Sequence, residues 1–322
     1  MKNPYSYFIS TNLIINFHRI PSSVWFRNII KRISKIYNFV SIQEIEEYYY
    51  AQNQFNNCCH ICFDDGDNTV FENALPIIKE FNIPITLFVS PKIIIEKSNY
   101  WFQEYSCIRE KVSDVEIKKV IAEKTLFDFK QINKYSAINI LKNLTMNEIT
   151  DIISTLKKRY KINNTAYKNM TKQQIAEIMN YDLVTVGAHT LTHPILANES
   201  TEVAAEEIKQ GISLLRQITT RDIRYFAYPN GRPKLDFNLR EEKLLFNEQI
   251  KLAFTTSAGF FSKKDHPLRL PRIGLVGSQK ENSIWVYVKI LLTPVWKLIE
   301  AKKEINERKK IKKIYFPDFK TN

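Results

Sequence analysis

The chain has 322 residues, of which 44% are hydrophobic and 12% aromatic, so it can bury a sizeable core and is not a disordered protein. Its formal net charge is +13, but Lys, Asn and Ile are abundant throughout. We interpret the charge as a solvated basic surface, with attraction to anionic glycans or phospholipids as the alternative. No DNA- or RNA-binding signature accompanies the charge, so we expect no nucleic-acid partner.

The amino-terminal residues 1–12 lack a continuous apolar stretch, and no window reaches the roughly 18 uninterrupted apolar residues of a spanning helix. The four cysteines, Cys58, Cys59, Cys62 and Cys107, are too few and too clustered for a disulfide framework. We therefore expect a cytoplasmic protein. The Cys59–Cys62 spacing has no second cysteine pair to complete a zinc site, so we interpret these residues, with His60, as part of a buried strand.

The first half of the chain alternates between short apolar runs and helical patterns, which indicates parallel strand pairing and an α/β fold. In chain order we predict a strand at 13–18, a helical pattern at 29–50, a strand at 58–63, a helix at 74–81 and a strand at 85–89. Later elements are a strand at 183–188, a helix at 202–217 and strands at 225–228, 252–256 and 270–275.

Two segments lack this alternation. Residues 97–180 are predicted to be a helical insertion within a domain of residues 1–283, with a capping box at Thr171 and Gln174 that opens its last helix. Residues 284–322 form a tail in which an apolar stretch at 284–299 precedes a basic helix that reaches Lys313. This tail either packs on its own domain or lies as an amphipathic segment on the inner face of a membrane.

Two acidic residues follow the predicted strand at 58–63. Asp64 and Asp65 leave the strand at its carboxyl end, where α/β enzymes gather catalytic groups. Adjacent residues point in different directions there, so one carboxylate can bind a metal while the other contacts a water molecule. Alone, Asp-Asp-Gly could also be a polar turn.

Two of the five histidines, His189 and His193, follow the predicted strand at 183–188. Pro194 disfavours a helix at His193, so we expect a loop that turns both rings inward. Three protein ligands with an open position are typical of a catalytic metal site. Surface or core histidines are the structural alternative.

Together these motifs resemble those of the polysaccharide deacetylases of carbohydrate esterase family four, the NodB-homology group. Residues 62–66 are similar to the family's Thr-Phe-Asp-Asp-Gly, with Cys62 in place of Thr, and residues 189–193 match its His-Ser/Thr-x-x-His. Residues 83–89, 226–231 and 270–273 are similar to three further family segments. The resemblance spans about residues 13–276 apart from the insertion, and it implies a distorted (β/α) barrel.

Two departures from the family pattern affect the predicted site. The third motif has Ala227 where the family has Arg, so Arg272 is the candidate that orients the base. The family's Leu-x-Leu-x-His segment is missing downstream and a similar pattern ends at His18, which resembles the circularly permuted poly-N-acetylglucosamine deacetylases. A buried structural role is the alternative for His18.

The resemblance implies removal of an N-acetyl group from an acetamido sugar of a bacterial surface glycan or a lipid-linked oligosaccharide. Asp65, His189 and His193 would hold a divalent ion, with zinc expected from the nitrogen-rich set. Asp64 would be the general base, His18 the general acid, and a backbone amide near Tyr228 an oxyanion donor. A silent glycan-binding protein of the same fold and a two-His-one-carboxylate iron oxygenase are the rival functions.

Overall fold

A single curled sheet is the framework of the fold in the computed structural model, which describes residues 11–51, 53–163, 166–276, 292 and 302–315. Its strand order is β7-β6-β5-β4-β3-β1-β8, with β2 beside the start of β3, and all the strand pairings are parallel. The strands are β1 (Leu13–Phe17), β2 (Asn38–Phe39), β3 (Cys58–Phe63), β4 (Ile85–Val89), β5 (Val184–Ala188), β6 (Tyr225–Ala227), β7 (Leu252–Phe254) and β8 (Ile273–Gly274).

The two ends of the sheet approach each other. Phe254 at the end of β7 forms a parallel bridge with Leu270, and β8 begins three residues later beside β1. The sheet therefore curves into the distorted barrel that the sequence predicts. In this arrangement β1 lies between β3 and β8, which brings the residue after β1 to the same edge as the residues after β3.

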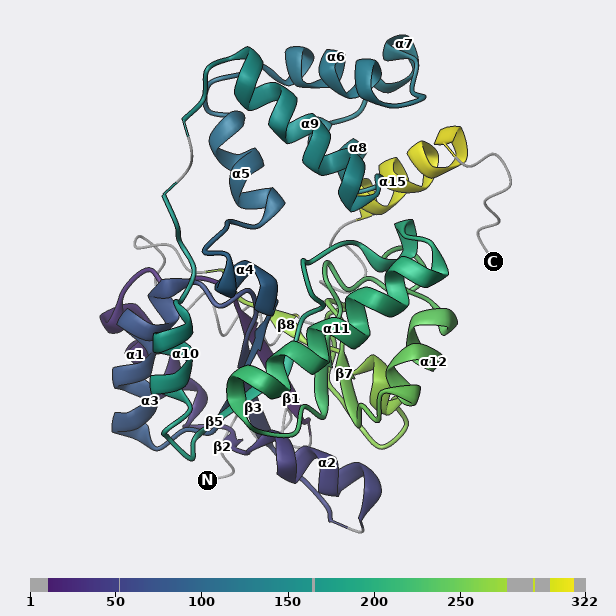
Figure 1. Ribbon diagram of the computed structural model, residues 1–322. Helices are drawn as coiled ribbons and strands as arrows, with labels where there is room; N and C mark the ends of the chain where they lie inside the picture. The colour runs from purple at the N-terminus through teal and green to yellow at the C-terminus, as the bar shows by residue number, and fades with distance from the viewer. Residues whose placement is uncertain (1–10, 52, 164–165, 277–291, 293–301, 316–322) are drawn as a thin grey trace.

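Helices cover the outer face of the curled sheet (Figure 1). They are α1 (Ser23–Ile33), α3 (Leu75–Phe81), α10 (Lys172–Ile178), α11 (Thr201–Thr219) and α12 (Leu239–Asn247), and a π-helical turn (Val70–Ala74) precedes α3. Helix α2 (Ile42–Tyr50) packs against the inner face through Ile42, Ile45 and Tyr48.

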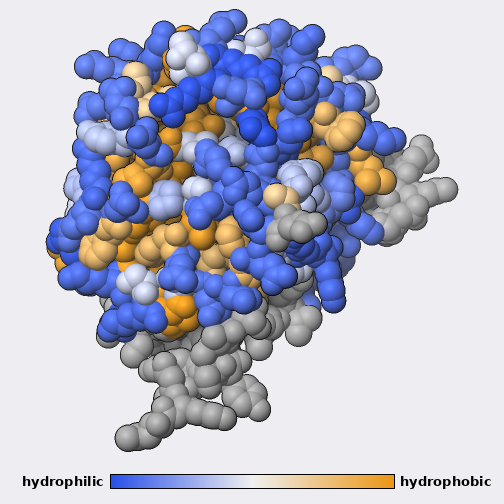
Figure 2. Space-filling model, turned by 90° about the horizontal axis from the view of Figure 1, so that it is seen from below, coloured by the Kyte–Doolittle hydropathy of each residue, from blue (hydrophilic) through white to orange (hydrophobic). Residues whose placement is uncertain are grey.

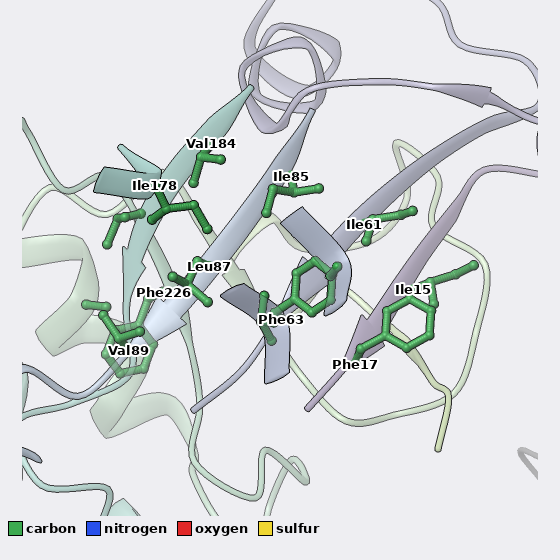
Figure 3. Packing of buried hydrophobic residues seen from close by; sticks show 14 of the residues in the cluster. Ile15, Phe17, Ile61, Phe63, Ile85, Leu87, Val89, Ile178, Val184 and Phe226 are labelled. Atoms are coloured by element: carbon green, nitrogen blue, oxygen red, sulfur yellow. The ribbon is translucent and has the colours of Figure 1, made fainter. Parts of the chain in front are cut away.

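Alternate residues of each strand point to opposite faces, so each strand contributes to two clusters. Outward side chains such as Phe17, Ile61, Phe63 and Leu87 join the main core with the covering helices (Figure 3). Inward side chains form a smaller cluster that includes Phe88 and Phe254.

The inner face also holds polar groups. Asn16, His60, Thr86 and Arg272 are at most 2% exposed. The imidazole of His60 lies 2.8 Å from the carbonyl oxygen of Val40 and 3.0 Å from the Thr86 hydroxyl, and burial lowers its pKa to about 4. This confirms the structural role expected for His60. Cys58, Cys59 and Cys62 are buried free thiols, as the strand interpretation requires.

The helical insertion forms a lobe with its own hydrophobic cluster (Figure 1). Its helices are α5 (Trp101–Ile108), α6 (Asp114–Lys124), α7 (Phe129–Ile132), α8 (Ala137–Leu141) and α9 (Met146–Arg159), whereas α4 (Pro91–Ile95) precedes the insertion and packs in the main core through Ile94. The cluster draws on residues from Trp101 to Ile162, whereas Ile175 and Ile178 of α10 pack in the main core. The capping box that opens α10 is present as predicted.

The basic helix of the tail, α15 (Lys302–Tyr315), packs on the protein itself. The fully buried guanidinium of Arg308 lies 2.6 Å from the Asp236 carboxylate, and fully buried Ile311 joins the cluster of the insertion. This is the first of the two arrangements expected for the tail, so these side chains face protein rather than lipid. Apart from Leu292, the apolar stretch at 284–299 lies outside the described residues.

Among the described residues, no helix has the length and apolar character needed to cross a membrane. The face seen from below in Figure 2 is largely hydrophilic, with hydrophobic side chains also reaching the surface in a band across it. Such a mixture is ordinary for a folded protein, because apolar atoms contribute more than half of most protein surfaces.

The structure departs from the predicted elements in three places. The pattern at 29–50 is two helices, because Ser41 caps a new helix through a capping box with Glu44. Helix α12 was not predicted, although Asn238 and Glu241 form a capping box at its start. The strand predicted at 270–275 is reduced to β8.

Candidate metal centre

The predicted site residues come together at the carboxyl edge of the sheet. Asp64 and Asp65 follow β3, His189 follows β5, and His18 follows β1. Because parallel strands all end at the same edge, residues more than 120 positions apart become neighbours.

One carboxylate and two imidazoles form a compact group. The Asp65 Oδ1 atom lies 3.5 Å from His189 Nε2 and 3.4 Å from His193 Nε2. All three residues are buried, and their ligand atoms lie within 4.8 Å of one another. This is the predicted metal-ligating trio, brought together by the fold.

Two observations indicate that the trio fits a cation. Asp65 Oδ1 is buried and has no hydrogen-bond partner among the described residues, which is costly for a carboxylate oxygen unless a cation satisfies it. The Nδ1 atom of His189 lies 2.6 Å from the carbonyl oxygen of Ala227, so Nδ1 carries the proton and Nε2 offers its lone pair to the centre. The donor set therefore suits a divalent ion.

Burial and neighbouring charges set the protonation of Asp65 and His193. Burial alone would raise the pKa of Asp65, but His189, His193 and His18 lower it far below its ordinary value. Burial and the neighbouring His189 lower the pKa of His193 to about 3. The carboxylate is thus ionised and His193 neutral at physiological pH, which are the forms that bind metals.

Asp64 lies beside the trio in a buried ion pair. The Arg272 guanidinium donates from Nη1 and Nη2 to the two oxygens of Asp64, both at 2.8 Å, and Asn16 Nδ2 donates to Oδ2 at 2.9 Å. Burial would raise the pKa of Asp64, but Arg272, His189 and His18 bring it below its usual value. Asp64 is therefore an ionised carboxylate held in a fixed orientation.

Arg272 is itself anchored on the inner face of the barrel. Its Nε donates to the Thr255 carbonyl at 2.9 Å, and its guanidinium lies 5.8 and 5.9 Å from the ring centroids of Phe88 and Phe254. The sequence proposed Arg272 as a substitute for the arginine missing at Ala227, and its contact with Asp64 supports that orienting role.

The other two predicted residues also lie at the cleft. His18 is half exposed, and its Nε2 lies 3.9 Å from Asp64 Oδ2 and 3.9 Å from Asp65 Oδ2. Tyr228 is buried, with its hydroxyl donating to the Leu268 carbonyl and its backbone amide donating to the Phe254 carbonyl. In this structure the Tyr228 amide is thus already bonded, and the oxyanion role predicted near it remains a prediction.

The loop that carries both histidines is anchored by Glu207 of α11. The Glu207 carboxylate accepts from the backbone amides of Leu191 and Thr192 at 3.0 and 2.9 Å and from the Thr192 hydroxyl at 2.6 Å. Within the loop, the His193 amide donates to the Thr190 hydroxyl at 2.9 Å. These bonds hold Thr190 and His193 in the left-handed conformation that turns the rings inward.

Close contact between this loop and α11 requires a glycine. A Cβ atom added to Gly211 would lie 2.7 Å from the Thr190 carbonyl carbon and 2.8 Å from the Leu191 nitrogen. Both are backbone atoms, so a Gly211→Ala substitution must displace the loop.

We expect Gly211→Ala to lower the free energy of unfolding by about 1–3 kcal/mol through overpacking and to weaken metal binding. Chemical denaturation and zinc titration measure the two effects. Gln210→Ala, at an exposed position of the same helix, is the matched control and should change neither. Wild-type zinc affinity in Gly211→Ala would show that the loop does not depend on this contact.

The trio opens into a cleft of about 540 Å³. Its barrel side includes His18, Asp64, Tyr228 and Arg232, and the facing side includes Trp101, Phe102, Ile138 and Lys142 of the insertion. Glu304 of α15 also lines the cleft, where it lies 2.8 Å from Lys142 Nζ. The insertion and the tail helix therefore form one wall of the site.

Several site residues carried no signal in the sequence. Asn16 lies in the segment that predicted His18 but was given no role, and Glu207 is one of many acidic residues in helical patterns. Tyr100 and Phe102, which contact His193, belong to the insertion, and only the fold shows that they reach the metal ligands.

Comparisons with known proteins agree with this geometry. A family model for polysaccharide deacetylases matches residues 51–124 and 127–246. A poly-beta-1,6-N-acetyl-D-glucosamine N-deacetylase from Staphylococcus aureus is 29% identical over 107 residues, covering 24% of this chain and 35% of the relative. The match thus spans about a third of that relative's length.

Two solved structures share the fold over most of the chain. The Streptococcus pyogenes deacetylase PplD, in complex with acetate, has a TM-score of 0.57 at 16% identity, covering 88% of this chain and 98% of that one. IcaB from Ammonifex degensii has a TM-score of 0.58 at 18% identity, covering 89% and 97%. Since the family match extends over more than half of the residues and includes both the Asp-Asp and the His motif, the chain belongs to the polysaccharide deacetylase family.

Proposed function

We propose that this protein is a metal-dependent N-deacetylase that removes acetyl groups from an N-acetylglucosamine glycan and releases acetate. The observation that carries the proposal is the buried trio of Asp65, His189 and His193 with the ionised, oriented Asp64 directly beside it. Family membership supports the reaction class, and the named activity of the Staphylococcus aureus relative supports the sugar.

The reaction needs a metal, a base and an acid, and the site offers a candidate for each. A divalent ion held by the trio, zinc by the nature of the donors, would polarise the acetyl carbonyl and lower the pKa of a water molecule. Asp64 takes a proton from the attacking water while the oxygen of that water bonds to the carbonyl carbon. His18, half exposed at the mouth of the cleft, gives a proton to the nitrogen as the C–N bond breaks. The products are acetate and an amino sugar.

The cleft supports a glycan substrate. Trp101 and Phe102 present aromatic surface, while Arg232, Lys142 and Glu304 present polar groups, the combination that ligand sites use for packing and orientation. A surface polysaccharide or a lipid-linked oligosaccharide fits this description.

Acetate release from oligomers of defined linkage tests the substrate. We expect the zinc-loaded protein to release acetate faster from β-1,6-linked than from β-1,4-linked N-acetylglucosamine oligomers of equal length. Faster release from the β-1,4 series would contradict the expected preference for β-1,6 linkages and leave the reaction class standing. Binding of oligomers without acetate release from either series would favour the silent glycan-binding protein instead.

A further inference from the structure

The two histidines of the trio are held in different ways. His189 Nδ1 is bonded to the Ala227 carbonyl, the usual means of fixing a metal-ligating imidazole. His193 Nδ1 is buried and has no hydrogen-bond partner in the described part of the chain. Its ring must therefore be oriented by packing.

Two aromatic rings of the insertion supply this packing. The Tyr100 and Phe102 ring centroids each lie 5.2 Å from that of His193, at interplanar angles of 74° and 61°. The two aromatic rings also stack on each other, 5.2 Å apart and 13° from parallel. Edge-to-face contacts of this kind are directional. Together they restrict the rotation of the imidazole.

The Tyr100 side chain also contacts the backbone of Asp65, the carboxylate ligand. The fully buried Tyr100 hydroxyl donates to the Asp65 carbonyl at 2.9 Å and accepts from the Ser90 amide at 3.4 Å. The Ser90 hydroxyl in turn donates to the His189 carbonyl at 2.7 Å. Asp65 has a φ of 69°, an uncommon conformation for a residue with a side chain, which persists only when its surroundings enforce it.

From these contacts we infer that Tyr100 and Phe102 are positioning residues for the metal centre, acting through Asp65 and His193. They stand at the first turn of α5, where the insertion begins, so they connect the separate core of the insertion to the metal ligands. The inference rests on the proposed function only in requiring that the trio bind a divalent ion.

Metal affinity tests this role without reference to turnover. The full-length protein is stripped of metal and titrated with zinc against a chromophoric chelator, and its cobalt form is examined by visible absorption, which reports ligand geometry. We expect Tyr100→Phe and Phe102→Leu each to weaken zinc binding by about 10–100-fold, as loss of a residue that orients a ligand does, and to alter the cobalt spectrum.

Two further variants make the test specific. Tyr105→Phe removes a hydroxyl from the same helix within the insertion's own core, and it should keep wild-type affinity and spectrum. Phe102→Tyr keeps an aromatic edge against His193 and should also keep wild-type affinity.

Wild-type zinc affinity and cobalt spectrum in both Tyr100→Phe and Phe102→Leu would overturn the inference and leave the proposed function standing. Equal weakening in Tyr105→Phe would also overturn it, because the effect would then come from general loosening of the insertion. A wild-type protein that binds neither zinc nor cobalt would overturn the inference and the proposed function together.

Discussion

Replacing Asp64 by Asn is expected to lower kcat for acetate release by about 10²–10⁴-fold, the usual contribution of general base catalysis. The two side chains have nearly the same shape, so the amide oxygen of the Asp64→Asn variant can still accept from Arg272. The amide cannot take a proton from water. Because Asp64 is not one of the trio, zinc should still bind with a stoichiometry of one.

Zinc content and acetate release measured on the same sample separate the two effects. A companion substitution, Asp65→Asn, should lose metal as well as turnover, which distinguishes the ligand from the base. Substantial acetate release by metal-loaded Asp64→Asn would remove the base assignment from Asp64.

A second large effect is expected at Arg272. Arg272→Met leaves the Asp64 carboxylate buried without its bidentate partner, and breaking a buried pair in this way costs about 3–5 kcal/mol of unfolding free energy. Turnover should fall too, since Asp64 loses the contact that fixes its orientation. Chemical denaturation and acetate release measure the two losses.

Arg27→Met is the matched control for this prediction. Arg27 pairs with Glu80, and the two side chains are 39% and 43% exposed, so losing this pair should cost no more than about 1 kcal/mol. Arg272→Lys keeps the charge without the two parallel hydrogen bonds and should be intermediate in turnover. An Arg272→Met protein as stable and active as Arg27→Met would show that the ion pair has no part in orienting the base.

The longer strands were predictable because each has a continuous apolar run bounded by turn residues. The boundaries of β3 and β4 agree with the predicted 58–63 and 85–89, and both strands are buried along their whole length. The weaker predictions concern short elements. The segment at 270–275 has a strand-like composition, but Pro271 removes a backbone donor and only Ile273 and Gly274 pair with β1.

The site residues were predictable where they belong to short local motifs. Asp64 and Asp65 share one motif and His189 and His193 another, and parallel strands bring the two motifs to one edge. His18 and Arg272 lie outside the residues that the family model matches, yet their side chains reach the same centre.

The remaining parts of the site depend on tertiary packing. Glu207, Gly211 and Tyr100 act through backbone atoms of other segments, and nothing in their local sequence marks such contacts. The same holds for Glu304, which reaches the cleft only because α15 packs between the insertion and the barrel.

Acetate release by the wild-type protein, before chelation, after chelation and after zinc is returned, is the most direct test of a metal-dependent deacetylase. The assay uses β-1,6-linked N-acetylglucosamine oligomers, with Asp65→Asn as a control that zinc should not rescue. The proposed function predicts that acetate release is lost on chelation and restored by zinc. Acetate release that persists in the metal-free protein would contradict the proposed function. A lack of acetate release by protein with zinc bound would contradict it as well.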